Sequence, residues 1–343
     1  MSCMRVAIGM VMALCGGGNG ALAAGRFDGC VRAALILPVL GMDGGPVVPI
    51  AINGVAAAVV TPRASALFVH DTPALHLPPG RSRAFVSVTG WNKAYETTIA
   101  HLAIGPSAVS NVRAYVDTAG PPARIGGRPV LMVLGYPLLS HYAVLIDMPH
   151  KAIGLFTYGG FTYGGAHCPG IGDMFAGPHF TVPLHTASQV HQEIGVTAEI
   201  DGTAVEMELN PASNGSIISE RDARRIGVSS SALENDPQVR TAAGPVLTGR
   251  RHRFGVFSIG GKAYRDVYLD VEHGATYNPL GFDFFLANTS IIDFPGHSLH
   301  FAPNSGVQPF AAEDGPWYVS TSSTRDAHAD IDAHRHEGAR GSP

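Results

Sequence analysis

The stretch PLGFDFF at residues 279–285 repeats, with changes, the stretch VLGYPLL at residues 133–139. Each is followed by a hydrophobic segment with an Ile-Asp pair before a proline, AVLIDMP at residues 143–149 and SIIDFP at residues 290–295. The two glycines are 146 residues apart, and so are the two aspartates. A constant spacing over separate landmarks indicates that the chain contains two copies of one unit.

The two copies are also visible upstream, as a strand, a tight turn and a second strand. In the first copy VPIAING at residues 48–54 leads into VVTPRAS at residues 59–65, and in the second IGVTAEIDG at residues 194–202 leads into ELNPAS at residues 208–213. Alternating apolar residues that end in Asn-Gly or Asp-Gly are typical of β-hairpins. Thr61 and Asn210, at the ends of the second strands, are 149 residues apart, close to the later spacing.

The composition agrees with a chain made of strands. Of 343 residues, 45% are hydrophobic and only 15% are charged, and 42 Gly with 25 Pro favour turns over long helices. A short helix is predicted at residues 220–226, where Gly227 stops it. Each half has too few strands to close by itself. We therefore expect an all-β fold of two lobes that bury their open sides against each other across a shared groove.

The beginning of the chain is typical of an export signal. Arg5 precedes an apolar run at residues 6–14, and ALA at residues 21–23 is a small-x-small cleavage pattern. We therefore expect an exported protein, periplasmic or extracellular. Lipid attachment at Cys15 is a weaker alternative, because Leu14 stands where a small residue is expected. No later segment is long and apolar enough to cross a membrane.

The landmarks divide the sequence into five parts. These are a signal peptide at 1–24, a first lobe at 25–156, a connector at 157–185, a second lobe at 186–303 and a disordered tail at 304–343.

Cys30 and Cys168 remain after the signal peptide is removed. In an exported protein they are candidates for a disulfide, which would tie the connector to the first lobe. Two buried, unbonded thiols are the alternative.

Together these features resemble the bacterial exported retropepsin-like aspartic peptidases, which carry both lobes in one chain. The resemblance rests on the hydrophobic-Gly segments, on GFDFF at residues 281–285 beside the family's Gly-x-Asp-Phe-Leu run, and on the paired hairpins. It covers about residues 30–303. It implies two β-barrel lobes, a peptide-binding cleft covered by flap hairpins, and an Asp-Thr-Gly loop in each lobe that supplies one catalytic aspartate.

Both Asp-Thr-Gly loops are replaced here: by Thr61, Pro62 and Arg63 in the first lobe, and by Asn210, Pro211 and Ala212 in the second. Aspartic peptidases need two carboxylates that share one proton. Neither Thr61 nor Asn210 can exchange a proton near neutral pH. The resemblance therefore implies a pseudopeptidase with no intact catalytic residue, whose cleft still binds a peptide or protein ligand.

Two other functions stay open. One is a working hydrolase that uses displaced acids, with Asp117 as the first candidate. The other is a structural envelope protein with a filled cleft. Asp117 is otherwise interpreted as a turn residue before Pro121-Pro122, and the repeated Asp147 and Asp293 as turn or strand-end residues.

Trp91 and Arg251 fall where the resemblance places the flap hairpins. They are candidates to cap an apolar ligand and to meet an acidic one, and the alternative is an exposed hairpin with a solvated charge run. No compact set of His or Cys residues predicts a metal site, and no cofactor is expected. The net charge of −4 does not favour nucleic acid as a partner. The histidine-containing tail has no predicted role.

Overall fold

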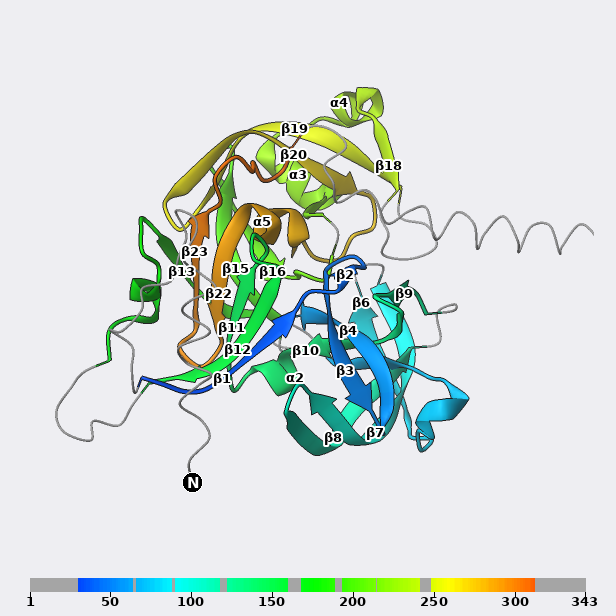
Figure 1. Cartoon of the computed structure of the whole chain (residues 1–343). Coiled ribbons are helices and arrows are strands. Elements are labelled where there is room, and N and C mark those ends of the chain that lie inside the picture. Colours follow the sequence, from blue (N-terminus) through cyan, green and yellow to red (C-terminus); the bar gives the residue numbers. More distant parts are fainter. Residues whose placement is uncertain are drawn as a thin grey trace, which may run out of the picture.

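The computed structural model describes residues 30–63, 66–87, 90–117, 122–159, 168–188, 193–213, 215–240 and 248–311. Over these ranges the chain is mostly β-structure in three sheets, with short helices between the strands (Figure 1). The predicted all-β, two-lobed fold is confirmed. The signal peptide, residues 1–24, lies outside the described residues.

The first lobe is built on a nine-stranded sheet within the described residues. Its strands are β2 (Gly41–Met42), β3 (Pro46–Ile52), β4 (Val55–Arg63), β5 (Phe68–His70), β6 (Ser82–Ser87), β7 (Gly90–Ile104), β8 (Ser107–Asp117), β9 (Arg124–Ile125) and β10 (Arg128–Gly135). The 3₁₀-helix η1 (Pro73–Leu75) and the helix α2 (Tyr136–Leu139) belong to this lobe.

The second lobe has an eight-stranded sheet in the part of the chain that is described. Its strands are β14 (His185–Ser188), β15 (Glu193–Ile200), β16 (Thr203–Leu209), β17 (Ile217–Ser219), β18 (Gln238–Arg240), β19 (Thr248–Ile259), β20 (Lys262–Glu272) and β21 (Pro279–Leu280). Its helices are α3 (Glu220–Ile226), α4 (Ser230–Asn235) and α5 (Phe282–Ala287).

The predicted helix at residues 220–226 is confirmed as α3. The Ser219 hydroxyl accepts a hydrogen bond from the Asp222 backbone N–H at 3.2 Å, which caps the amino end. Gly227 ends the helix with φ of 113°, a conformation that glycine adopts without steric cost.

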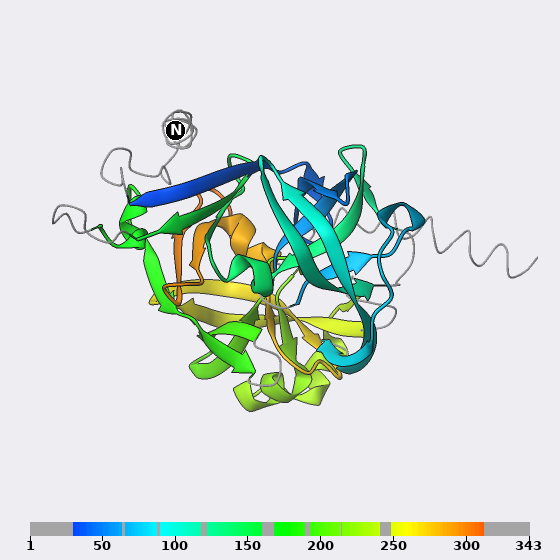
Figure 2. The same ribbon diagram turned by 90° about the horizontal axis from the view of Figure 1, so that it is seen from below.

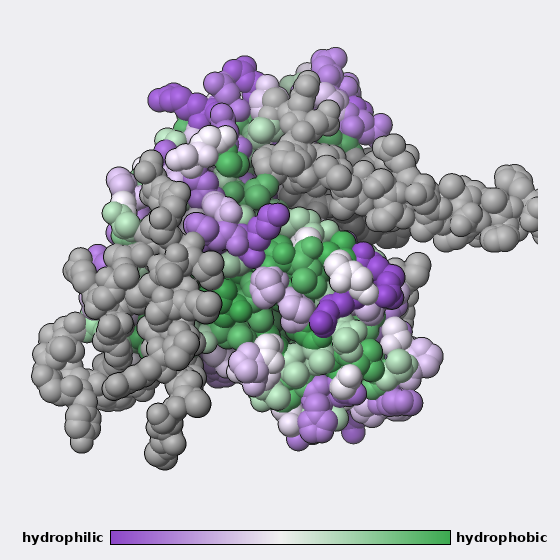
Figure 3. All heavy atoms as spheres, in the orientation of Figure 1, coloured by the Kyte–Doolittle hydropathy of each residue, from purple (hydrophilic) through white to green (hydrophobic). Residues whose placement is uncertain are grey.

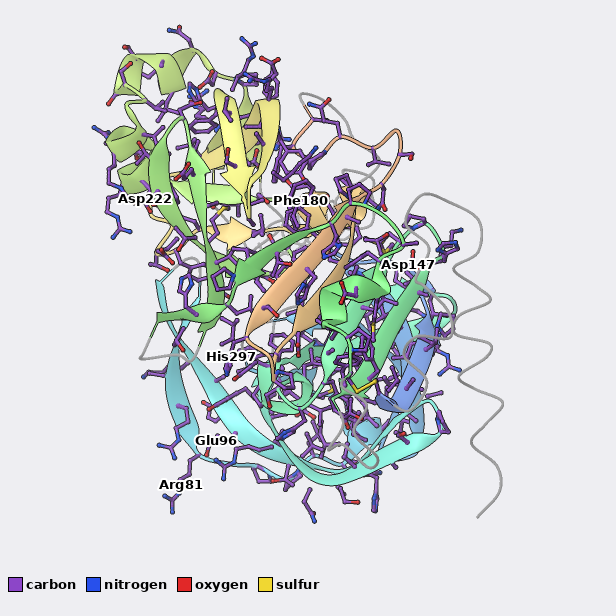
Figure 4. All side chains as sticks on the ribbon, turned by 90° about the vertical axis from the view of Figure 1, so that its left-hand side faces the viewer. Arg81, Glu96, Asp147, Phe180, Asp222 and His297 are labelled. Atoms are coloured by element: carbon purple, nitrogen blue, oxygen red, sulfur yellow. A yellow bond between two sulfur atoms is a disulfide. The ribbon has the colours of Figure 1, made fainter. Side chains whose placement is uncertain are left out.

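A six-stranded sheet with the order β1-β12-β11-β22-β23-β13 joins the lobes. Its strands are β1 (Val31–Pro38), β11 (Ala143–Asp147), β12 (Ala152–Tyr158), β13 (Phe180–Pro183), β22 (Asn288–Asp293) and β23 (Ser298–Pro303). In Figure 2 β1, in dark blue, runs along the edge of this sheet. Asp222 and Glu96 lie in opposite lobes (Figure 4).

The central pair of this sheet reflects the duplication. Strands β11 and β22 run antiparallel, with Leu145 opposite Ile291. These two residues are 146 apart, the spacing of the repeat, so each stands opposite its own counterpart. The repeat is therefore related by an approximate two-fold axis that passes through this residue pair.

The connector predicted at residues 157–185 carries structure of its own. It contains the 3₁₀-helix η2 (Ile171–Met174), and β13 adds to the edge of the central sheet. The predicted disulfide is confirmed: Cys30 and Cys168 are bonded, with their Cα atoms 5.7 Å apart. The bond ties the connector to the segment before β1.

The prediction that disorder begins at residue 304 is wrong for residues 304–311. Phe310 is completely buried, and its ring lies 4.7 Å from that of Phe257. The Asn304 side chain accepts a hydrogen bond from the Thr289 hydroxyl at 2.8 Å. The segment is ordered because the Phe310 ring is buried in the aromatic core of the second lobe. Residues 312–343, with the tail histidines, lie outside the described residues.

Candidate functional site

The loop after β16 holds Asn210 at the end of a core strand. The Asn210 backbone N–H donates to the Leu280 carbonyl at 3.0 Å, and β21 runs parallel to β16 at this point. The Ser213 N–H donates back to the Asn210 carbonyl at 2.8 Å, which closes a tight turn over Pro211 and Ala212. The preceding Leu209 packs in the core, so strand alternation turns Asn210 toward the outer face.

Gly281 crosses directly behind this loop. A Cβ atom on Gly281 would lie 2.2 Å from the backbone carbon and oxygen of Gly215, closer than any real contact. Only glycine permits this approach. The hydrophobic-Gly segment thus supports the loop that carries Asn210.

Asp283 holds the same loop through hydrogen bonds to Ser216. Its carboxylate accepts hydrogen bonds from the Ser216 N–H at 3.0 Å, the Ser216 hydroxyl at 2.7 Å and the Phe284 N–H at 2.9 Å. Burial raises the pKa of Asp283, and the Ser216 hydrogen bonds oppose that rise. Because all of these hydrogen bonds come from Ser216 or from the backbone, the role of Asp283 is to position the loop.

Arg251 also lies behind the loop and does not face an open flap. It is 9% exposed, pairs with Asp270 at 2.7 Å and donates to the Ala311 carbonyl at 2.8 Å. Neither expectation for Arg251, contact with an acidic ligand or an exposed and solvated charge, agrees with this buried, paired side chain. Arg253 pairs with Asp266, and His252 lies 2.6 Å from Asp236, so these side chains of the run are also engaged. The charges were expected to be solvated because the run is polar, but β19 packs one face of it against the core.

In the first lobe Thr61 stands near the end of β4. Strand β10 runs parallel to β4, and Gly135 lies opposite Arg63. Strand β3 pairs on the other side of β4, and this pairing ends with Val47 opposite Val60, the residue before Thr61. The Thr61–Pro62 peptide is cis. The side chain of Arg63 lies outside the described part of the structure.

The turn between β2 and β3 connects the two loops. A Cβ atom on Gly45 would lie 2.3 Å from the Pro211 carbonyl oxygen and 2.7 Å from the Ala212 Cα. Gly45 lies two residues before Val47, which pairs with Val60, the neighbour of Thr61. The second-lobe loop therefore lies against the first lobe within about two residues of Thr61.

Ala212 adds an apolar contact between the lobes. Its side chain packs on a small cluster on the outer face of the first-lobe sheet, formed by Val47, Ala58, Val60 and Val130. Apolar side chains gather over β2, β3 and β4 on the face seen in Figure 3. Ala212 thus helps to close the lobe junction.

Both residues at the aspartate positions bury an unpaired oxygen. Thr61 is 0% exposed and Asn210 is 7% exposed, and no described residue donates or accepts a hydrogen bond at Thr61 Oγ1 or Asn210 Oδ1. A buried polar atom without a partner costs about 1–3 kcal/mol. Buried polar atoms of this kind are commonly satisfied by an ordered water molecule or a ligand.

The structure adds two acids that the sequence did not single out. Asp43 precedes the Gly44-Gly45 turn, and its N–H donates to the Gly45 carbonyl at 3.0 Å. Its carboxyl group is half-buried, burial raises its pKa, and no described residue forms a hydrogen bond or ion pair with it. Glu208 is buried on β16, two residues before Asn210. In the sequence, the stretch DGG at residues 43–45 indicates a tight turn. Its neighbours along the chain do not indicate that this turn contacts the loop at residues 211–212.

Other predicted site residues are not brought to this junction. Trp91 pairs with Val86 near the tip of the β6–β7 hairpin, as expected for a flap, but its side chain is outside the described residues. Asp147 accepts from His150 and Asp293 from the Gly296 N–H at 2.9 Å, which confirms both as turn residues.

Asp117, the displaced-acid candidate, lies at the end of β8. It stands opposite His70 of β5, which is separated from β4 by β10. Three strand spacings correspond to roughly 14 Å.

Within the described residues no group of three or more His, Cys, Asp or Glu side chains is arranged to hold a metal ion. No helix in those ranges is long and apolar enough to cross a membrane.

Comparison with known proteins relates the second lobe to the aspartyl proteases. Residues 196–284 match the Aspartyl protease family, a span that includes Asn210, Gly281 and Asp283. No curated protein sequence matches the chain.

Two proteases are among the solved structures that match the chain. The aspartic proteinase from Irpex lacteus is 13% identical, with a TM-score of 0.44, and the alignment covers 82% of this chain and 100% of that one. A retropepsin-like aspartic protease from Rickettsia conorii is also 13% identical, with a TM-score of 0.28, over 36% of this chain and 90% of that one.

Proposed function

We propose that this protein is a catalytically inactive homologue of the aspartyl proteases that binds a polypeptide segment where its two lobes meet. The observation that carries the proposal is the pair of buried, unpaired oxygens on Thr61 and Asn210. They stand on the two loops where the family resemblance expects the catalytic carboxylates. The fold frame is retained while the ionisable groups at those positions are replaced.

The chemistry of these side chains supports the loss of activity. In an aspartic protease one carboxylate activates a water molecule and the other, protonated, polarises the scissile carbonyl. The Thr61 hydroxyl is not a base near neutral pH, and the Asn210 amide neither takes up nor releases a proton in that range. General acid and base catalysis contribute about 10²- to 10⁴-fold each, so the loss of both leaves no useful rate.

Export is part of the proposal. The Cys30–Cys168 disulfide is typical of an oxidising compartment, and the first 24 residues have the pattern of a signal peptide. We infer a periplasmic or extracellular location. A partner in that compartment is an extended peptide or a protein segment, with no cofactor and no metal.

Displaced-acid catalysis through Asp117 is less favoured by the strand register. The acids nearer to the junction are Asp43 and Glu208, so the test of inactivity has to include them. A structural role with a filled junction predicts no peptide binding at all.

The test measures cleavage and binding on one preparation. The protein is incubated with unfolded, carboxymethylated casein from about pH 3 to pH 7, with and without pepstatin, next to an active aspartic protease. We expect no cleavage, and we expect the immobilised protein to retain peptides from a casein digest. Cleavage that pepstatin blocks and that Asp43→Asn or Glu208→Gln abolishes would show a displaced pair of acids and overturn the proposal.

A further inference from the structure

Part of the connector covers one face of the central six-stranded sheet. This part, residues 169–179, contains η2 and is called the strap here. It lies between two fixed ends, since the Cys30–Cys168 disulfide precedes it and β13 follows it. Apolar side chains of the strap and of the sheet form one cluster. It consists of Ile171, Met174 and Phe175 from the strap, and Ala143, Leu145, Phe156, Ile291 and Ala302 from the sheet.

A buried histidine of the sheet lies beneath the strap. His300 on β23 is 8% exposed, and its neighbours Leu299 and Phe301 point into the main core, so strand alternation turns His300 toward the strap. Gly172 of η2 closes over it. A Cβ atom on Gly172 would lie 2.9 Å from His300 Nδ1 and 2.8 Å from His179 Nε2. The closed strap therefore holds two imidazole rings around one glycine.

The hydrogen bonds of His300 serve either charge state. Its Nδ1 lies 2.9 Å from the Thr181 hydroxyl, and its Nε2 lies 2.8 Å from the Ser298 hydroxyl. Because a hydroxyl can donate or accept, the neutral ring and the imidazolium both keep two partners. Hydrogen bonding therefore does not decide the charge of His300.

Burial is the main reason why His300 stays neutral under the strap. It lowers the pKa of His300 below the usual 6.5, while the Asp293 carboxylate of β22 opposes this fall and the His179 ring adds to it. Water that reaches the ring when the strap lifts removes the cost of burying a charge. The open strap therefore lets His300 bind a proton more readily than the closed strap does.

The other titratable groups of the interface are engaged locally. Asp173 of η2 accepts from the Gly170 N–H at 3.0 Å, and Tyr158 of β12 donates its hydroxyl to the Pro169 carbonyl. Strand β13 contributes no titratable side chain. The acid that acts on His300 is Asp293, and its effect is smaller than that of burial.

We propose that the strap is a pH-sensitive cover, which lifts from the central sheet in acid when His300 takes up a proton. The lifted strap stays attached at both ends and exposes the apolar sheet face beneath it. The closed form is favoured above pH 6.5, and this advantage is lost as pH falls below that value toward the lower pKa of the closed form. The inference is independent of polypeptide binding at the lobe junction.

Hydrogen–deuterium exchange of the whole protein measures the lifting. Protection factors for peptides from residues 169–179 are corrected for the pH dependence of intrinsic exchange. We expect them to fall about five-fold or more from about pH 7.5 to about pH 5, while those of β11 and β22 do not fall. Buried carboxylates such as Asp283, whose pKa is raised by burial, respond to pH in the opposite sense, so the measurement is confined to the strap.

Two substitutions should both keep the strap closed in acid, by different means. His300→Gln cannot take up a proton in this range, so the protection of the strap should no longer depend on pH. Thr181 is exposed, and Thr181→Asp places a carboxylate beside His300 Nδ1, which stabilises the imidazolium under the strap. The matched control is His297→Asn on the β22–β23 turn. His297 is exposed with φ of 52°, which suits asparagine, so this variant should lose protection as the wild type does.

Each result decides for or against the strap as a pH-sensitive cover. A wild-type strap whose protection does not change with pH overturns the proposal, and so does a loss that persists in His300→Gln. If His300→Gln does not fold, a Thr181→Asp variant that loses protection like the wild type overturns it. An equal loss over the strap and the central sheet indicates global unfolding and also contradicts the proposal. Peptide retention by the immobilised protein is measured separately, so failure here leaves the proposed function standing.

Discussion

At the scale of single residues, the junction is made of groups that cost stability in the free protein. Thr61 and Asn210 bury polar atoms without described partners, whereas the Asp283 carboxylate accepts several hydrogen bonds. Natural proteins keep such costs mainly where another molecule offsets them. Stability measurements on single variants can therefore distinguish the site from its supports.

Thr61→Val should leave the free energy of unfolding unchanged or raise it by about 1 kcal/mol, because it replaces an unpaired buried hydroxyl with a methyl group. The matched control is Thr97→Val. Thr97 is equally buried, and its hydroxyl donates to the Pro78 carbonyl at 2.8 Å, so that variant should lose about 1 kcal/mol or more. Urea unfolding followed by fluorescence measures both. An equal loss in the two variants would mean that Thr61 has a partner in solution.

Asp283 should make the protein more stable in acid. Burial raises its pKa in the folded state above the ordinary value of 3.8, so the folded state holds this proton more tightly. Its contribution is complete below pH 3.8 and is lost as pH rises through the higher folded pKa. Burial also raises the pKa of Asp43 and the pKa of Asp270. The Arg251 guanidinium opposes the rise at Asp270.

The measurement is the free energy of unfolding against pH, from about pH 4 to pH 7. The free energy of unfolding of the wild type should fall with rising pH, and that of Asp283→Asn should fall less steeply. At low pH the variant should be less stable than the wild type, because the Ser216 hydroxyl loses a hydrogen-bond acceptor. Asp266→Asn controls for the loss of a surface carboxylate. Parallel slopes in wild type and Asp283→Asn would contradict the prediction.

At the scale of elements, the two hydrophobic-Gly segments form the supports of the loops. Strand β10 lies parallel to β4, which carries Thr61, and β21 lies parallel to β16, which ends just before Asn210. The close approach depends on glycine in the second lobe, where the segment passes over Gly215.

Gly281→Ala should lower the free energy of unfolding by about 3 kcal/mol, because its Cβ has no room next to the Gly215 backbone. Gly170→Ala is the control: its Cβ would meet Asp173 at an ordinary 3.5 Å, and its φ of −60° suits alanine. Thermal unfolding by differential scanning fluorimetry compares the two. If Gly281→Ala unfolds at the wild-type temperature, the crossing segment does not support the loop as described.

At the scale of the whole molecule, the central six-stranded sheet and one disulfide hold the lobes together. The bond joins residues 138 apart in the sequence, so it closes a long loop of the unfolded chain. Constraining a loop of that size stabilises a protein by about 4–5 kcal/mol in the chain-entropy model.

Cys30→Ser with Cys168→Ser should therefore lower the free energy of unfolding by about 4 kcal/mol. Reduction of the wild type with dithiothreitol should produce the same loss, and dithiothreitol should not affect the double variant. Denaturant titrations with and without reductant measure this. A double variant as stable as the oxidised wild type would show that the central sheet alone holds the connector.

Sequence by itself determined the class of fold, the two-fold repeat, helix α3 and the cysteine pair. These follow from periodicity, spacing and capping residues, which are properties of neighbouring positions. The Asp147 and Asp293 turns belong to the same group, since each aspartate bonds within three residues.

Tertiary structure alone decided what surrounds Thr61 and Asn210. The approach of Gly45 to Ala212 and the half-buried Asp43 depend on which strands pair and on how the lobes dock. Arg251 looked like a surface charge and Phe310 like part of a tail, yet both are buried, because packing between distant segments sets exposure. Hydrogen bonding and desolvation act between residues that are close in space, and nothing local in the chain records those distances.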